Sequence, residues 1–263
     1  MRLTREIRFS VGESPDLPVT NSWAGWPTAT GVRPYLVLRV AVEGRPDERT
    51  GYLVNIRDLD RLLRERTIPL VNRLYAATDP PASLTGERLI SAIAGDLAPH
   101  VPAGARWAGC RVYLTPFLYY QMQGGEMIEV TQSFEFAAAH RLHCADMSEA
   151  RNYEIFGKCN NPNGHGHNYQ LEVTVAGRPD PATGHVIPLR QMEEIVNERV
   201  INRFDHKHLN QDCPEFRTLN PSVENITRVI WGLLEGQFGA ARLARVRVWE
   251  TAKTYAEYEG SEK

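Results

Sequence analysis

The fold of this chain is decided by a short stretch near its middle, which reads Gly157-Lys158-Cys159-Asn160-Asn161-Pro162-Asn163-Gly164-His165-Gly166-His167-Asn168-Tyr169. His165 and His167 are two residues apart, and residues i and i+2 of an extended strand point to the same face, so both imidazoles can converge on one ion. The same phase continues through Tyr169, Leu171 and Val173, which predicts a strand whose later residues are buried. The two histidines then lie at the start of that strand.

A second alternating run, upstream of the first, can supply a third ligand. Phe134, Phe136 and His140 are in phase with one another, so a hairpin of the two strands would bring His140 to His165 and His167. A single His-x-His pair also occurs by chance on solvent-facing strands. Three histidines with no carboxylate or thiolate at ligand spacing favour zinc with an open fourth position, which is the catalytic arrangement.

Five blocks of sequence, in the same order, resemble the 6-pyruvoyl tetrahydropterin synthase family. They are Ala139–His143, Phe156–Tyr169, Phe204–Asn210, Asn220–Asn225 and Val246–Thr251. The similarity covers about residues 126 to 260, and five ordered blocks are far more specific than any single one. The resemblance implies the tunnelling fold (T-fold), in which three units, each an antiparallel sheet with helices on one face, close into a barrel.

The resemblance also implies which side chains move protons. Cys159 matches the family's proton-abstracting cysteine, and a thiol beside a metal or a cation such as Lys158 ionises more readily than a free one. Asp205 and His206 match its acid/base partner. The alternative for His206 is a helix C-terminus, where a histidine is favoured by the helix dipole.

Three further residues are implied as substrate ligands. Glu250 continues an inward-facing alternation, and its carboxylate matches the two parallel N–H donors at the edge of a pterin. Glu224 and Ser222 occupy positions that line the family's pterin pocket, although a glutamate in a first helical turn is also a good dipole partner. The helix there is predicted to start with Asn220 as its cap and Pro221 in its first turn.

An internal repeat predicts the architecture. Gly44–Asp47 and Gly177–Asp180 share the sequence Gly-Arg-Pro-Asp at an offset of 133 residues. Each follows an apolar strand, Tyr35–Val42 or Tyr169–Val175, and precedes two helical patterns and a closing strand. The predicted class is α+β, with two tandem T-fold units, each a four-stranded antiparallel sheet with two helices on one face.

The two copies are predicted to divide the chain into residues 1–122 and 126–263, joined by a short polar connection. The positions of the first copy that align with the paired histidines of the second are Val32 and Pro34, or Gly31 and Arg33 when the tyrosines are matched. Neither alignment leaves a histidine, so the metal chemistry is lost there. Glu87 aligns with the glutamate of the substrate pocket, and one carboxylate does not make a site. We therefore expect a degenerate, structural first copy and a catalytic second copy.

The family resemblance implies a zinc-dependent carbon–oxygen lyase of tetrahydrobiopterin biosynthesis. It would convert 7,8-dihydroneopterin triphosphate to 6-pyruvoyl tetrahydropterin with loss of triphosphate and no redox cofactor. An alternative is 6-carboxy-5,6,7,8-tetrahydropterin synthase of queuosine biosynthesis, which also releases acetaldehyde and whose cysteine lies closer to its His-Gly-His segment than Cys159 does here. A non-catalytic module that binds pterin or zinc is an alternative of another class.

The composition of the chain limits which binding partners and which cellular compartment are expected. With 30 basic and 32 acidic residues and a net charge of -2, a general role on nucleic acid or on a membrane surface is not expected. No apolar run approaches the roughly 20 residues that cross a bilayer, and the first residues lack the apolar segment of a signal peptide. The four cysteines form no Cys-x-x-Cys pair, so reduced thiols and a cytoplasmic location are expected. Because the family's pocket lies between subunits, we expect a homotrimer, with one ring of active units and one of inactive units.

Overall fold

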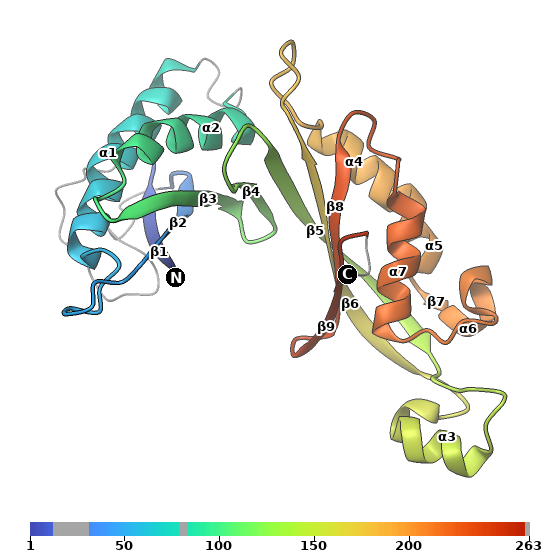
Figure 1. Cartoon of the computed structure of the whole chain (residues 1–263). Coiled ribbons are helices and arrows are strands. Elements are labelled where there is room, and N and C mark those ends of the chain that lie inside the picture. The colour runs from blue at the N-terminus through green and yellow to red at the C-terminus, as the bar shows by residue number, and fades with distance from the viewer. Residues whose placement is uncertain (13–31, 79–83, 261–263) are drawn as a thin grey trace. The chain divides into compact units, whose positions relative to one another are not determined.

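The computed structural model describes residues 1–12, 32–78 and 84–260, and its chain divides into two compact units (Figure 1). Unit 1 consists of Met1–Val130 with Gly177–Val186, and unit 2 of Thr131–Ala176 with Ile187–Lys263. Parts of the two predicted domains, at 13–31, 79–83 and 261–263, lie outside the described residues.

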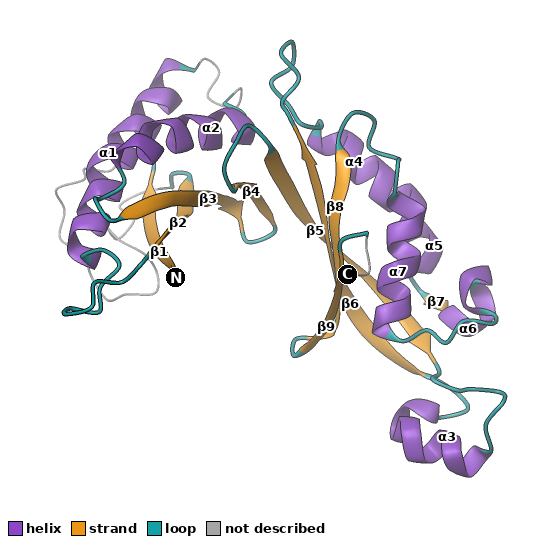
Figure 2. Ribbon diagram, viewed as in Figure 1, coloured by secondary structure: helices purple, strands orange, loops and turns teal. Residues whose placement is uncertain are grey.

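Unit 1 contains four strands paired as antiparallel neighbours in chain order and two long helices. They are β1 (Arg2–Ser10), β2 (Tyr35–Gly44), α1 (Ile56–Ala77), α2 (Gly86–Leu97), the 3-10 turn η2 (Ala98–His100), β3 (Ala105–Thr115) and β4 (Leu118–Met122). Figure 2 shows α1 and α2 together along one side of these strands. Their apolar faces pack on the sheet because Leu59 and Leu63 of α1, and Ile90 and Ile93 of α2, are buried at helical spacing.

Unit 2 holds most of the remaining elements. They are β5 (Ile128–His140), α3 (Glu149–Phe156), η3 (Gly157–Asn160), β6 (His165–Gly177), α4 (Leu189–Val196), η4 (Asn197–Ile201), α5 (Asn202–Phe204), β7 (Lys207–His208), α6 (Leu209–Asp212), η5 (Pro214–Phe216), α7 (Val223–Leu234), β8 (Arg242–Thr251) and β9 (Thr254–Tyr258). Side chains of β6 at Tyr169, Leu171, Val173 and Val175 are fully buried, as their alternation predicted. The helices predicted from apolar spacing are confirmed as α1, α2, α4 and α7.

The expectation of two separate four-stranded sheets is not confirmed. Within the described residues the strands form one nine-stranded sheet in the order β1-β2-β3-β4-β5-β6-β8-β9, with β7 beside β5. The physical reason lies at residues 121–126, where we expected a linker. There Gly124 (φ 103°) and Gly125 (φ 70°) lie in a short bend between β4 and β5, and these two strands are neighbours in the sheet.

Helix α3 and η3 were not predicted from the sequence. Ser148 caps α3 by accepting a hydrogen bond from the Arg151 N–H, and Gly157 ends the helix with a positive φ of 52°. This excursion leaves β5 and returns at β6, and it carries Cys159. It therefore sets the position of the candidate proton-abstracting thiol.

Candidate metal centre

Three histidines converge where β5 ends and β6 begins. His140 is the last residue of β5, and His165 and His167 open the neighbouring strand β6. One nitrogen from each ring lies within 4.8 Å of the other two, and the two Nε2 atoms of His140 and His165 are 3.1 Å apart. The structure thus brings His140 together with His165 and His167, as the alternation within each strand and the pairing of the two strands predicted.

The orientation of the His140 ring is fixed by its other nitrogen. His140 is fully buried, and its Nδ1 lies 2.7 Å from the carbonyl oxygen of Pro221, which can only accept a hydrogen bond. Nδ1 therefore carries the hydrogen, and Nε2 presents its lone pair to the other two rings. The hydroxyl of Tyr169 lies 3.4 Å from the same Nδ1. A backbone carbonyl behind a metal-ligating histidine is the usual way in which tautomer and ring direction are set.

The electrostatics of the group suit a metal. Burial is the largest effect that lowers the pKa of His140, and together with the neighbouring His165 and His167 it brings that pKa to about 4. Burial also lowers the pKa of His165, with His167 adding to the effect. Imidazole binds metal in its neutral form, so these rings are ready to bind at neutral pH. Nδ1 of His165 and Nε2 of His167 are buried without a hydrogen-bond partner among the described residues, and a three-nitrogen donor set fits zinc.

A carboxylate faces the three rings. Glu250 lies on β8, which pairs with β6 so that Trp249 is opposite Gln170. Its Oε1 atom is 3.4 Å from Nε2 of His140 and 3.6 Å from Nε2 of His167. The predicted substrate ligand is therefore a neighbour of the metal-binding nitrogens.

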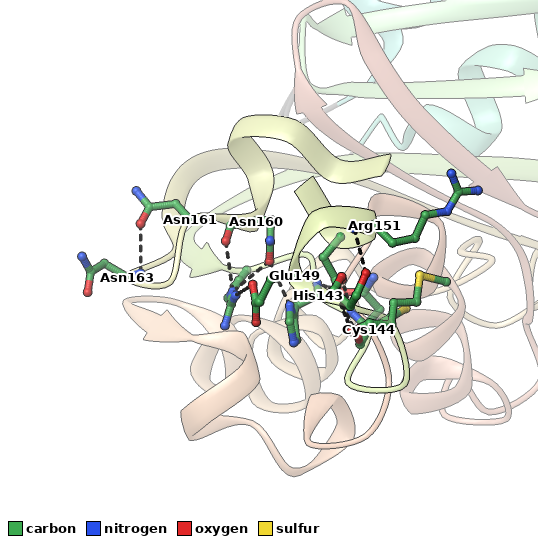
Figure 3. A network of polar contacts seen from close by, with 12 residues as sticks. His143, Cys144, Glu149, Arg151, Asn160, Asn161 and Asn163 are labelled. Carbon is green, nitrogen blue, oxygen red and sulfur yellow. Dashed lines mark hydrogen bonds and ion pairs between the residues drawn. The ribbon is translucent and has the colours of Figure 1, made fainter. Parts of the chain in front are cut away.

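The loop that carries Cys159 is held by the residues that follow β5. The Leu142 N–H donates to the Cys159 carbonyl (2.9 Å), and Nε of Arg141 donates to both the carbonyl and Oδ1 of Asn160 (3.1 Å each). Nδ1 of His143 lies 3.0 Å from the same Oδ1, and Figure 3 shows these contacts around Asn160. The Cys159 side chain is partly exposed. Sequence reasoning left His143 without a role, and the contact with Asn160 supplies one.

Asp205 and His206 form a pair at the surface of unit 2. Oδ1 of Asp205 accepts a hydrogen bond from the Ala137 N–H (2.8 Å), and Oδ2 lies 2.7 Å from Nδ1 of His206. These two contacts hold the pKa of Asp205 below its ordinary value. His206 has a φ of 57° and a side chain that is 83% exposed. Within the described residues, the pair makes no hydrogen bond or ion pair with Cys159 or the metal-binding rings.

Ser222 and Glu224 lie at the start of α7. Ser222, expected in the substrate pocket, is the N-cap: its Oγ accepts from the Asn225 N–H (3.4 Å), and the helix begins at the next residue. The predicted start, with Asn220 as cap and Pro221 in the first turn, is therefore wrong. The reason is tertiary, because the Pro221 carbonyl accepts the bond from the buried imidazole and stays outside the helix. Glu224 is exposed in the first turn.

An antiparallel sheet covered by helices, with a buried three-histidine group on adjacent strands, defines an α+β protein suited to holding a transition metal. The model of the family described as 6-pyruvoyl tetrahydropterin synthase matches residues 129–261, the half of the chain that carries this group. The chain belongs to the 6-pyruvoyl tetrahydropterin synthase family.

Individual relatives cover the same half. The chain is 40% identical over 132 residues to 6-pyruvoyl tetrahydrobiopterin synthase of Homo sapiens, an alignment that covers 50% of this chain and 91% of the human protein. It is 40% identical over 131 residues to the Poecilia reticulata protein of the same name, covering 50% of this chain and 89% of the relative. The solved structure of Caenorhabditis elegans 6-pyruvoyl tetrahydropterin synthase is similar at 36% identity and a TM-score of 0.49, covering 51% of this chain and 96% of that one.

None of the helices in the described ranges combines the length and apolar character needed to span a membrane.

Proposed function

We propose that the C-terminal half converts 7,8-dihydroneopterin triphosphate to 6-pyruvoyl tetrahydropterin and triphosphate, with zinc as its metal. The observation that carries the proposal is the convergence of His140, His165 and His167 within a segment that is 40% identical to a relative named for that product class. A zinc ion held by the three rings would supply Lewis-acid polarisation of the substrate's side-chain oxygens.

The chemistry of substrate and product defines what the protein's own groups must do. Loss of triphosphate breaks a C–O bond and turns one side-chain hydroxyl carbon into a ketone through its enol. When the second hydroxyl becomes a carbonyl, two electrons and two protons pass to the C=N bond of the dihydropterin ring. The reaction therefore needs no redox cofactor, and it needs groups that take protons from carbon and return them.

Cys159 is the group to which we assign proton abstraction. Its loop is held by backbone and side-chain contacts while its side chain is partly exposed, so the thiol is positioned and reachable. His206, with Nδ1 committed to Asp205, presents Nε2 for proton exchange. Because the described contacts do not join this pair to Cys159, we assign it to a site completed by another copy of the chain.

Glu250 is assigned to the pterin, whose adjacent N–H donors a carboxylate can accept in pairs. Ser222 and Glu224 remain candidates for the wall of the same pocket. Residues 1–122 are proposed to be a structural copy of residues 126–263, since two strands, two longer helices and two closing strands follow one another in both halves once α3, η3 and the short elements between α4 and α7 are set aside.

The assembly we propose is a homotrimer in the cytoplasm. Native mass spectrometry tests it directly, and a stable monomer would contradict it. The four cysteines are free, as a reducing compartment requires.

The reaction is tested by incubating the zinc-loaded chain with 7,8-dihydroneopterin triphosphate and identifying products by mass spectrometry. We expect 6-pyruvoyl tetrahydropterin and triphosphate from wild type, and a loss of at least about a hundredfold in turnover for Cys159→Ala. Cys144→Ala is the matched control, because Cys144 is also a partly exposed thiol on this excursion and has no assigned role. Release of acetaldehyde would instead indicate the carboxy enzyme, and binding without product would indicate a binding module.

A further inference from the structure

The sheet of unit 1 carries a hollow lined by arginines on the face opposite α1 and α2. In β2 and β3, Leu38 and Val112 are fully buried in the core, so the adjacent Arg39 and Arg111 point to the other face. Figure 2 shows both helices on the same side of these strands. A cavity of about 360 Å³ lies on the arginine side, and Arg2 lines it together with Arg39 and Arg111. Among the described residues, no carboxylate lines this cavity.

Arg39 and Arg111 are directly opposite each other in the pairing of β2 with β3. Two like charges in this arrangement destabilise a sheet. Arg39 donates to the Tyr113 hydroxyl (2.9 Å), and Arg111 donates to the same oxygen (3.0 Å). A tyrosine hydroxyl is uncharged at neutral pH, so it orients both guanidinium groups without cancelling their charge. Arg39 also shares Glu6 with Arg8, so one carboxylate serves two arginines.

Arg111 has no carboxylate of its own. Its Nε donates to Oε1 of Gln121 (2.6 Å), and the amide of Gln121 donates onward to Glu129 (3.2 Å). That carboxylate lies on β5, beyond the strand that carries Gln121. Within the described residues, neither Arg111 nor Arg2 forms an ion pair. The cavity therefore has an excess of positive charge.

The equivalent arginine of unit 2 is neutralised. Arg247 lies between Glu172 and Glu257 in the register of β6, β8 and β9, and it pairs with both. Like Arg111, it lies over a tyrosine ring of the next strand, at 5.1 Å from the centroid for Arg247 and 4.4 Å for Arg111. The same position of the sheet is thus balanced in one unit and left with positive charge in the other. Packing does not require that excess, which indicates that a ligand supplies the missing negative charge.

We propose that the cavity between Arg2, Arg39 and Arg111 binds an oligophosphate chain. Arginine forks match phosphate oxygens in pairs, and a chain of phosphates carries several negative charges where a carboxylate carries one. A second cavity, of about 600 Å³, shares Arg39 and is also lined by Tyr35 and Tyr113. A cavity of this volume holds a small organic molecule, so an organic group attached to the chain would lie there.

The test is isothermal titration calorimetry of the full chain with inorganic tripolyphosphate and, in a second series, with ATP. We expect tripolyphosphate to bind, and to bind more weakly as salt is raised. Arg39→Gln and Arg111→Gln should each weaken binding by at least about tenfold, because each removes charge-assisted hydrogen bonds. Arg106→Gln is the matched control: Arg106 is an exposed arginine of β3 that pairs with Glu43 outside the cavity, and we expect a change within about twofold. A wild-type chain that binds neither compound, or arginine variants that bind as tightly as wild type, would overturn the proposal.

Hydrogen exchange on the wild-type chain locates the site without any variant. Tripolyphosphate should slow exchange in peptides that cover residues 105–123, and protection confined to peptides of unit 2 would overturn the proposal. Tighter binding of ATP than of tripolyphosphate would support a site that extends into the second cavity, and equal binding would support a site for the phosphate chain alone. No pterin is present and these arginines lie outside the metal centre, so the result does not depend on the proposed function.

Discussion

Asn152 holds together the loop from which the Cys159 excursion starts. It is fully buried on α3, and its Oδ1 accepts a hydrogen bond from the Cys144 N–H (2.8 Å). Its Nδ2 donates toward the carbonyls of Cys144 (2.9 Å), Met147 (3.2 Å) and Ser148 (3.2 Å). Replacing Asn152 with alanine leaves these backbone groups without a hydrogen-bond partner. Because the site is buried, bulk water does not replace the lost hydrogen bonds.

The magnitude follows from counting the bonds that Asn152 can make well. Its amide has two hydrogens for three carbonyls, and the Ser148 carbonyl also accepts the backbone N–H of Asn152, so about three hydrogen bonds are lost in effect. At about 1 kcal/mol each, Asn152→Ala should lower the free energy of unfolding of this region by about 2–3 kcal/mol.

The assay is hydrogen exchange followed by mass spectrometry on peptides covering 144–161, alongside urea unfolding. We expect faster exchange in Asn152→Ala at the Cys144 N–H, and lower turnover with unchanged zinc affinity, because the loop carries Cys159 and not the metal ligands. Asn163→Ala is the matched control, because Asn163 is exposed and its hydrogen bond to Oδ1 of Asn161 uses only its backbone N–H. The reasoning would be refuted if the hydrogen-exchange rates of Asn152→Ala matched those of wild type and its free energy of unfolding lay within about 0.5 kcal/mol of the wild-type value.

Three further changes test contacts elsewhere. Asp205, whose pKa is lowered by the Ala137 N–H, contributes stability that is present above its unfolded pKa of about 3.9 and is lost as pH falls through its lower folded value. Asp205→Asn should therefore have a lower free energy of unfolding than wild type at pH 7. Denaturant unfolding at a series of pH values should show this difference shrinking toward about pH 3. Glu87 is 1% exposed and accepts the Val186 N–H (3.1 Å), so Glu87→Ala should cost about 1–3 kcal/mol in urea unfolding, and Glu87→Gln, which keeps the acceptor, clearly less. Gly164 has a φ of 74° and no room for a Cβ, so Gly164→Ala should lower both the melting temperature and zinc affinity by displacing the start of β6.

The parts of the site that follow backbone geometry could be read from the sequence. His165, His167 and Tyr169 share a face because successive strand side chains alternate, and no tertiary information is needed for that. Apolar spacing likewise indicated the long helices, since each needs one buried stripe.

The parts that depend on distant contacts could not be read in this way. Asn220 and Ser222 are both good caps, and the choice between them is made by a hydrogen bond to a residue 81 positions away. Gly124 and Gly125 suit a flexible linker as well as a short bend between paired strands, so the continuous strand order could not be predicted from the local sequence. The contact between Glu250 and the histidines also depends on how two strands pair, which no single segment specifies.

The bond between His140 and the Pro221 carbonyl joins the metal centre to the residue that directly precedes the N-cap of α7. Insertions or deletions in the connection between α6 and α7 can therefore be accommodated only if they leave this one peptide group in place. A homologue or an engineered variant with a longer connection should keep its metal when the extra residues precede Pro221. The same change made between Pro221 and the helix would rotate the carbonyl away and release the imidazole.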